Sequence, residues 1–137
     1  MNRIQYLIDS SFREISSFSS KVRSFLEKNS ISEEIINAVD ISLVEALNNV
    51  VEHAYGMKQG NRIEINIEIV SNKIILQLCD WGIARTNLEK AKLDFDPDDI
   101  DNLPEGGMGL FIIEQLMDKT EYSSIDGKNT YIMVKSF

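Results

Sequence analysis

The spacing of apolar residues divides the chain into strands and helices. Residues 62–69 alternate strictly, with isoleucine at every second position and polar residues between. This alternation is typical of a strand with one buried face. Apolar runs and turn residues elsewhere complete the set of predicted strands, which are 3–8, 62–69, 73–80, 120–125 and 129–136. Asp126-Gly127 joins the last two, and this dipeptide favours a hairpin.

Three other segments repeat their apolar residues at steps of three and four, which predicts amphipathic helices. The first spans residues 11–28, the second begins after Ser32 as N-cap and continues toward Ala54, and the third spans residues 108–118. Tight turns join neighbouring strands, so the sheet should be mixed and mostly antiparallel, with the helices on one face. This order of elements predicts an α+β fold, a two-layer sandwich, in one domain covering residues 1–137.

Composition narrows the function classes. The 137 residues are 43% hydrophobic and 26% charged, as in an ordinary globular domain. The net charge of -8 argues against nucleic acid and anionic membranes as partners. The single cysteine excludes an intrachain disulfide. The N-terminal residues lack the apolar core of a signal peptide, and no stretch is long enough to span a membrane, so we expect a cytoplasmic protein.

The second predicted helix carries polar residues at a regular spacing. Glu45, Asn49 and His53 lie four residues apart, which places them on one stripe of a helix. Carboxylate and amide oxygens can bind a hard cation such as Mg²⁺ or polarise a hydroxyl. A solvated helix edge is the alternative, and the spacing alone does not decide between them.

Two further signals suggest a nucleotide. Asp80 ends a predicted strand just before Gly82, where its carboxylate could accept a hydrogen bond from an exocyclic amine such as N6 of adenine. The turn Gly106-Gly107-Met108-Gly109 opens a helix, whose free N–H groups can bind phosphate. An ordinary strand-end turn and a flexible hinge are the respective alternatives.

A long acidic stretch, residues 84–105, separates these two signals. Its acids would repel a bare triphosphate, so we expect Mg²⁺ and the helix N-terminus to balance the phosphate charge. Arg85 opens the stretch. We expect its side chain to face solvent, with a phosphate contact as the alternative.

In this order, the motifs resemble those of the Bergerat-fold ATPases. EALNNVVEHAY from Glu45 resembles the N-box, DWGIA from Asp80 the first glycine box, and EGGMGLFIIEQLMD from Glu105 the second. The second glycine box and the HAY ending are similar to the anti-sigma-factor serine/threonine kinases of partner-switching systems. The resemblance extends from about residue 33 to the C-terminus.

The resemblance implies a role for each matching residue. Glu45 would be the general base, Asn49 a ligand of Mg²⁺, and Asp80 the residue that reads adenine. Residues 84–105 would be the ATP lid. The nucleotide-binding residues would be Asn49, Asp80, Gly82, Ala84, Gly106, Gly107, Met108, Gly109, Leu110 and Thr130. Two departures affect the adenine pocket: Ala84 stands where the family often has glycine, and Trp81 is bulky for the turn.

The resemblance further implies a Mg-ATP-dependent serine/threonine kinase that is also an anti-sigma factor. Its partners would be an anti-sigma-factor antagonist, which it phosphorylates, and a sigma factor, and it would form a homodimer. Two other functions remain open. The domain could bind nucleotide and partner without transferring phosphate, or it could be the stand-alone ATP-binding domain of a histidine-kinase-like system.

Overall fold

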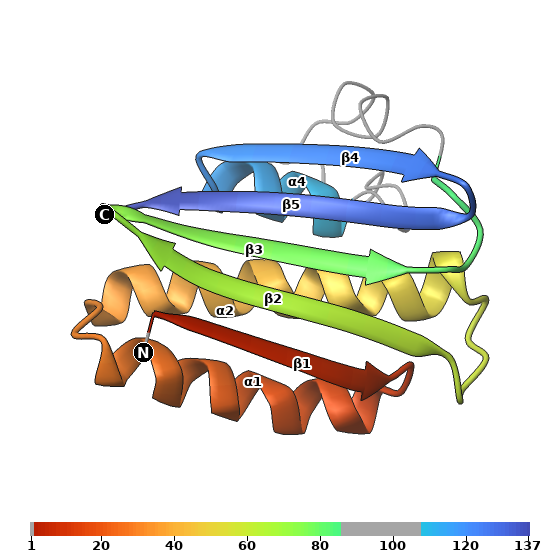
Figure 1. Ribbon diagram of the computed structural model, residues 1–137, viewed down its shortest axis with the longest axis horizontal. Coiled ribbons are helices and arrows are strands. Elements are labelled where there is room, and N and C mark those ends of the chain that lie inside the picture. The colour runs from red at the N-terminus through yellow and green to blue at the C-terminus, as the bar shows by residue number, and fades with distance from the viewer. Residues whose placement is uncertain (1, 86–107) are drawn as a thin grey trace, which may run out of the picture.

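A computed structural model describes residues 2–85 and 108–137, which form one sheet covered by helices (Figure 1). The five-stranded sheet has the order β1-β2-β3-β5-β4. Its strands are β1 (Arg3–Asp9), β2 (Arg62–Val70), β3 (Lys73–Asp80), β4 (Lys119–Ile125) and β5 (Lys128–Ser136). All four pairings between neighbours are antiparallel. The predicted α+β sandwich is confirmed, and this sheet is antiparallel throughout.

The helices α1 (Phe12–Lys28), α2 (Glu33–Asn49) and α4 (Met108–Leu116) lie on one face of the sheet (Figure 1). α1 begins after Ser11 and α2 after Ser32, and each serine hydroxyl accepts a hydrogen bond from the backbone N–H three residues on. Such caps satisfy donors that a helix end leaves free. No helix within the described ranges combines the length and apolarity needed to cross a bilayer.

The core lies between the sheet and α2. One face of β2 contributes Ile63, Ile65 and Ile67, and α2 contributes Leu43 and Leu47, all at most 1% exposed. Each such side chain stabilises the fold by about 1.5–3 kcal/mol when fully buried. This packing fixes α2 against the sheet, so the polar residues at its C-terminal end have defined positions.

The second predicted helix changes its winding near its end. α2 runs directly into η1 (Val50–Ala54), a π-helical segment closed by a 3.0 Å hydrogen bond from Tyr55 N to Val50 O. The side chain of His53 is 38% exposed beside Glu52. His53, the last member of the predicted stripe, therefore lies outside the lining of the pocket that Asn49 helps to form.

Candidate functional site

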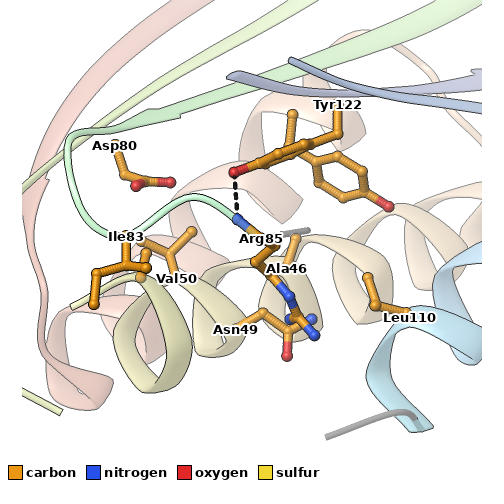
Figure 2. Close-up of a pocket in the computed structure, with 10 residues that line it drawn as sticks. Ala46, Asn49, Val50, Asp80, Ile83, Arg85, Leu110 and Tyr122 are labelled. Atoms are coloured by element: carbon orange, nitrogen blue, oxygen red, sulfur yellow. Dashed lines mark hydrogen bonds between the residues drawn. The ribbon is translucent and has the colours of Figure 1, made fainter. Parts of the chain in front are cut away.

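A pocket of about 390 Å³, partly open to solvent, lies between the helices and the sheet end where β3 stops (Figure 2). Its lining comes from α2, η1, the end of β3 and the segment after it, α4, β4 and β5, and consists of Ala46, Asn49, Val50, Ala54, Asp80, Ile83, Arg85, Leu110, Tyr122 and Tyr131. Asn49, Asp80 and Leu110, three of the predicted site residues, thus line one pocket.

Asp80 lies at the C-terminal end of β3 and is only 6% exposed. Its Oδ1 accepts hydrogen bonds from Gly82 N at 3.0 Å and from Asn129 Nδ2 at 2.7 Å. Burial raises the pKa of this carboxyl above its usual value, and the two hydrogen bonds oppose that shift. Since both of these donors use Oδ1, Oδ2 is the oxygen left to accept a ligand's N–H.

Asn129 holds Asp80 in place, a role that the sequence motifs did not indicate. It is 1% exposed at the start of β5, where it lies opposite Asp80 in the sheet. Its Nδ2 also donates to Gly82 O at 3.0 Å, and its Oδ1 accepts from Ser124 Oγ at 2.7 Å. The amide is therefore bonded on both sides, which fixes the orientation of the Asp80 carboxylate.

Gly82 allows the chain after β3 to cross η1 at close range. A Cβ at this position would lie 2.2 Å from the carbonyl oxygen of Ala54, so no larger residue fits without a backbone shift. The next residue, Ile83, donates its N–H to the same carbonyl at 2.7 Å. The contact directs Ile83 and Arg85 into the pocket lining.

The departures at Trp81 and Ala84 do not obstruct the pocket. Trp81 is outside its lining, and the guanidinium carbon of Arg62 lies 4.0 Å from the centre of the indole ring, with Lys128 Nζ at 5.9 Å. Ala84 is absent from the described residues with positive φ, so a side chain there brings no left-handed strain. Ala84 itself is outside the lining as well.

Glu45 and Asn49 meet the first turn of α4. A Cβ built on Gly109 would lie 2.9 Å from Glu45 Oε2 and 3.4 Å from Asn49 Nδ2. The helix start, the carboxylate and the amide therefore share one small space, in which a ligand oxygen could approach all three. Met108 begins α4. Gly106, Gly107 and the predicted lid beyond Arg85 lie outside the described residues.

Thr130 does not reach the pocket. Its Oγ1 lies 3.8 Å from Cys79 Sγ. Its neighbours Asn129 and Tyr131 face the helices, and successive side chains of a strand point to opposite faces. Thr130 is therefore on the face of the sheet away from the predicted nucleotide site.

Arg85 enters the pocket, so our prediction that it faces solvent was wrong. Its backbone N–H donates to Tyr122 Oη at 2.9 Å, and its guanidinium extends toward Asn49 (Figure 2). Burial lowers the pKa of this side chain. Tyr122 and Tyr131 form an aromatic wall beside it, with ring centres 6.4 Å apart. Burial raises the pKa of Tyr131 to about 12.

These residues fit a Mg-nucleotide. Asn49 Nδ2 and Arg85 Nη1 are buried without a hydrogen-bond partner in the described ranges, so the pocket holds donors for a ligand that carries acceptors. In those ranges no three acidic, histidine or cysteine side chains gather as metal ligands. A magnesium ion here would therefore take Asn49 Oδ1 together with phosphate oxygens and water, as this ion usually does.

Residues 9–135 match the family described as Histidine kinase-like ATPase domain, and the chain belongs to that family. Its branch follows from its relatives. The chain is 30% identical over 100 residues to "Anti-sigma F factor" of Clostridium beijerinckii, a match covering 73% of this chain and 69% of the relative. The predicted membership among the anti-sigma-factor kinases is thereby confirmed.

A second relative is "Serine-protein kinase RsbW" of Oceanobacillus iheyensis, 34% identical over 97 residues. That match covers 68% of this chain and 61% of the relative, less than two thirds of the relative's own length. The fold is also similar to the crystal structure of the RsbU and RsbW domains of a Mycobacterium tuberculosis protein. There the TM-score is 0.72 and the identity 14%, over 99% of this chain and 32% of the other. At that identity the likeness shows the fold alone.

Proposed function

We propose that the protein binds Mg-ATP in this pocket and transfers the terminal phosphoryl group to a serine or threonine hydroxyl of an anti-sigma-factor antagonist. The observation that carries the proposal is the meeting of Glu45 Oε2 and Asn49 Nδ2 at Gly109, 2.9 Å and 3.4 Å from where its Cβ would be. A module that only bound nucleotide would not need a carboxylate at the phosphate end of the pocket.

Each residue has a distinct task in this reaction. Bound Mg-ATP supplies the phosphoryl group and the metal charge that balances it. Asp80 Oδ2 would accept a hydrogen bond from the adenine amine, and Asn49 would hold the metal through Oδ1. Glu45 orients the attacking hydroxyl and takes its proton, while the oxygen–phosphorus bond to the acceptor forms and the bond to ADP breaks.

The names of the relatives support the partners. One relative is named an anti-sigma factor and another a serine-protein kinase. We accordingly propose a sigma factor as the second partner, a homodimer as the working form, and the cytoplasm as the location. A non-catalytic, nucleotide-gated binding module remains the alternative that the test must exclude.

The test is phosphotransfer from labelled Mg-ATP to candidate antagonist proteins by the wild type and Glu45→Ala. Loss of a positioned general base costs roughly 10²–10⁴-fold in rate. We expect phosphorylation of serine or threonine to fall by that factor, while the dissociation constant for Mg-ATP changes little. Glu52→Ala is the matched control, because this carboxylate is 45% exposed and outside the pocket lining.

Two results would contradict the proposal. If the wild type binds Mg-ATP but modifies no antagonist, the binding-module alternative is correct. If Glu45→Ala and Glu52→Ala transfer phosphate as fast as the wild type, Glu45 is not the base.

A further inference from the structure

Three buried side-chain atoms in the described ranges have no hydrogen-bond partner there: Ser42 Oγ, Asn49 Nδ2 and Arg85 Nη1. The last two belong to residues that line the same pocket. Both are donors, so neither can satisfy the other, and a buried donor without an acceptor costs free energy. Two unpaired donors in one pocket indicate that an acceptor outside the described residues completes the site.

The backbone of Arg85 is held at β4, and its side chain extends across the pocket toward α2. Its backbone N–H bonds Tyr122 Oη at 2.9 Å, which ties its Cα to β4. From there the side chain crosses the pocket, and its guanidinium points toward the Asn49 amide on α2 (Figure 2). Asn49 in turn lies beside Gly109, at the start of α4. The guanidinium is therefore at the end of the pocket where α4 begins, away from Asp80.

Arg85 forms no ion pair with another described residue, and the carboxylate that acts on its charge there is that of Glu52. Desolvation lowers its pKa, as expected for a cation held in a medium of low polarity. A guanidinium binds phosphate oxygens through charge-assisted hydrogen bonds, which are among the strongest in proteins. The chain has a net charge of -8, so its overall charge would repel a polyanionic ligand, and a cation in the pocket would offset that repulsion locally.

We propose that Arg85 is a phosphate-binding residue of the nucleotide site, which donates from Nη1 to an oxygen of the triphosphate beside Asn49. The inference rests on the proposed function for its ligand, but it does not require phosphotransfer. It assigns to Arg85 the discrimination between a nucleotide and a nucleoside. Adenine binding at Asp80 contributes equally to both, whereas the Arg85 contact exists only when phosphate is present.

The experiment measures dissociation constants for Mg-ATP and for adenosine by calorimetry with the wild type, Arg85→Met and Arg85→Lys. Removing one charged hydrogen bond should weaken Mg-ATP roughly tenfold to a hundredfold. Adenosine affinity should stay within about twofold, since it makes no phosphate contact. Arg85→Lys should lie between the two, because an ammonium keeps the charge without the planar fork.

Arg62→Met is the matched control. Arg62 also has a long cationic side chain, but it lies over Trp81 and outside the pocket lining. This variant should bind Mg-ATP like the wild type. Thermal unfolding of each ligand-free variant checks the fold, and Arg85→Met should melt at the wild-type temperature or above it, because it loses a buried unpaired donor.

The possible outcomes separate the two proposals. Equal weakening of Mg-ATP and adenosine by Arg85→Met, or no weakening of either, overturns the assignment of Arg85 and leaves the kinase proposal intact. A selective loss of Mg-ATP affinity in a protein that phosphorylates no antagonist supports Arg85 as a phosphate contact and overturns the kinase proposal.

Discussion

At the scale of single residues, three polar side chains form a hydrogen-bonded series at the Asp80 end of the pocket. Ser124 bonds Asn129, and Asn129 bonds Asp80, each at 2.7 Å. These hydrogen bonds hold the Asp80 carboxylate where its ionised form is poorly solvated. The fixed orientation of the carboxylate therefore costs some stability of the fold. Active sites often carry such costs, since the ligand and not the fold benefits from the buried charge.

Asp80→Asn should separate stability from binding. The folded pKa of Asp80 is raised, so the ionised carboxylate destabilises the fold at neutral pH, and this cost disappears as pH falls through the folded pKa. Asparagine keeps an acceptor for Gly82 N and Asn129 Nδ2 but has no charge. We expect its free energy of unfolding at pH 7 to equal or exceed that of the wild type, while Mg-ATP affinity falls at least about tenfold.

Urea unfolding between neutral pH and about pH 4 checks this prediction, because the variant should lack the gain in stability that the wild type obtains from Asp80 as the pH falls. Asp126→Asn serves as the control, because Asp126 is exposed in the β4–β5 turn with φ of 52°, a conformation that asparagine tolerates. Weaker stability of Asp80→Asn with unchanged nucleotide binding would show that Asp80 has a structural role only.

At the scale of elements, two glycines illustrate two different constraints. Gly82 lies against the backbone of η1, whereas Gly109 lies against the ends of the Glu45 and Asn49 side chains. A rigid backbone cannot yield to an added methyl group, but a carboxylate at the end of a flexible side chain can move. The same substitution should therefore have opposite consequences for fold and function.

Gly82→Ala should destabilise the protein by about 1–3 kcal/mol, a typical cost of overpacking. Gly109→Ala should fold at least as well as the wild type, since alanine favours a helix. It should nevertheless slow phosphotransfer at least about tenfold, because Glu45 Oε2 must leave a position 2.9 Å from the added Cβ. Chemical denaturation and the phosphotransfer assay measure the two effects. A destabilised but active Gly109→Ala would contradict the prediction.

The elements themselves were readable from the sequence, because their signals are local. The alternation in β2 and the caps Ser11 and Ser32 each act within a few residues. The π turn was not readable, since nothing in the periodicity of residues 50–54 marks the additional residue. A helix assigned from spacing alone is treated as uniformly α-helical.

The site residues were predictable only where they belong to a recognisable sequence motif. The motifs indicated Glu45, Asn49 and Asp80, but the role of Asn129 depends on β5 lying next to β3, an order that strand propensities do not determine. Arg85 was misplaced because a charged residue after a turn usually faces solvent. The hydrogen bonds of Ile83 N to Ala54 O and of Arg85 N to Tyr122 Oη, which direct it inward, are tertiary contacts.

At the scale of the whole molecule, the acidic composition bears on how the protein would hold the proposed magnesium ion. The chain has 22 acidic and 14 basic residues, yet its described part gathers no cluster of three metal-binding side chains. Magnesium bound by one amide oxygen needs further oxygen ligands. We propose that phosphate oxygens of the nucleotide and water supply them, so metal and nucleotide should bind as a unit.

We therefore expect Mg²⁺ alone to bind weakly, with no saturable heat at micromolar protein, and to raise ATP affinity at least about tenfold when both are present. Chelation with EDTA should reverse that gain. In Asn49→Ala the metal should no longer improve ATP affinity, which provides the control. Tight binding of Mg²⁺ to the nucleotide-free protein would contradict this prediction and indicate a separate metal centre.

Trp81 gives the molecule a built-in optical probe. It is the only tryptophan in the chain, and it directly follows the carboxylate proposed to read adenine. Its indole ring is stacked under Arg62 outside the pocket lining, so a bound base would not quench its fluorescence by contact. Any change in emission upon adding nucleotide would instead report movement of the backbone between Asp80 and Gly82, and it would do so without an attached label.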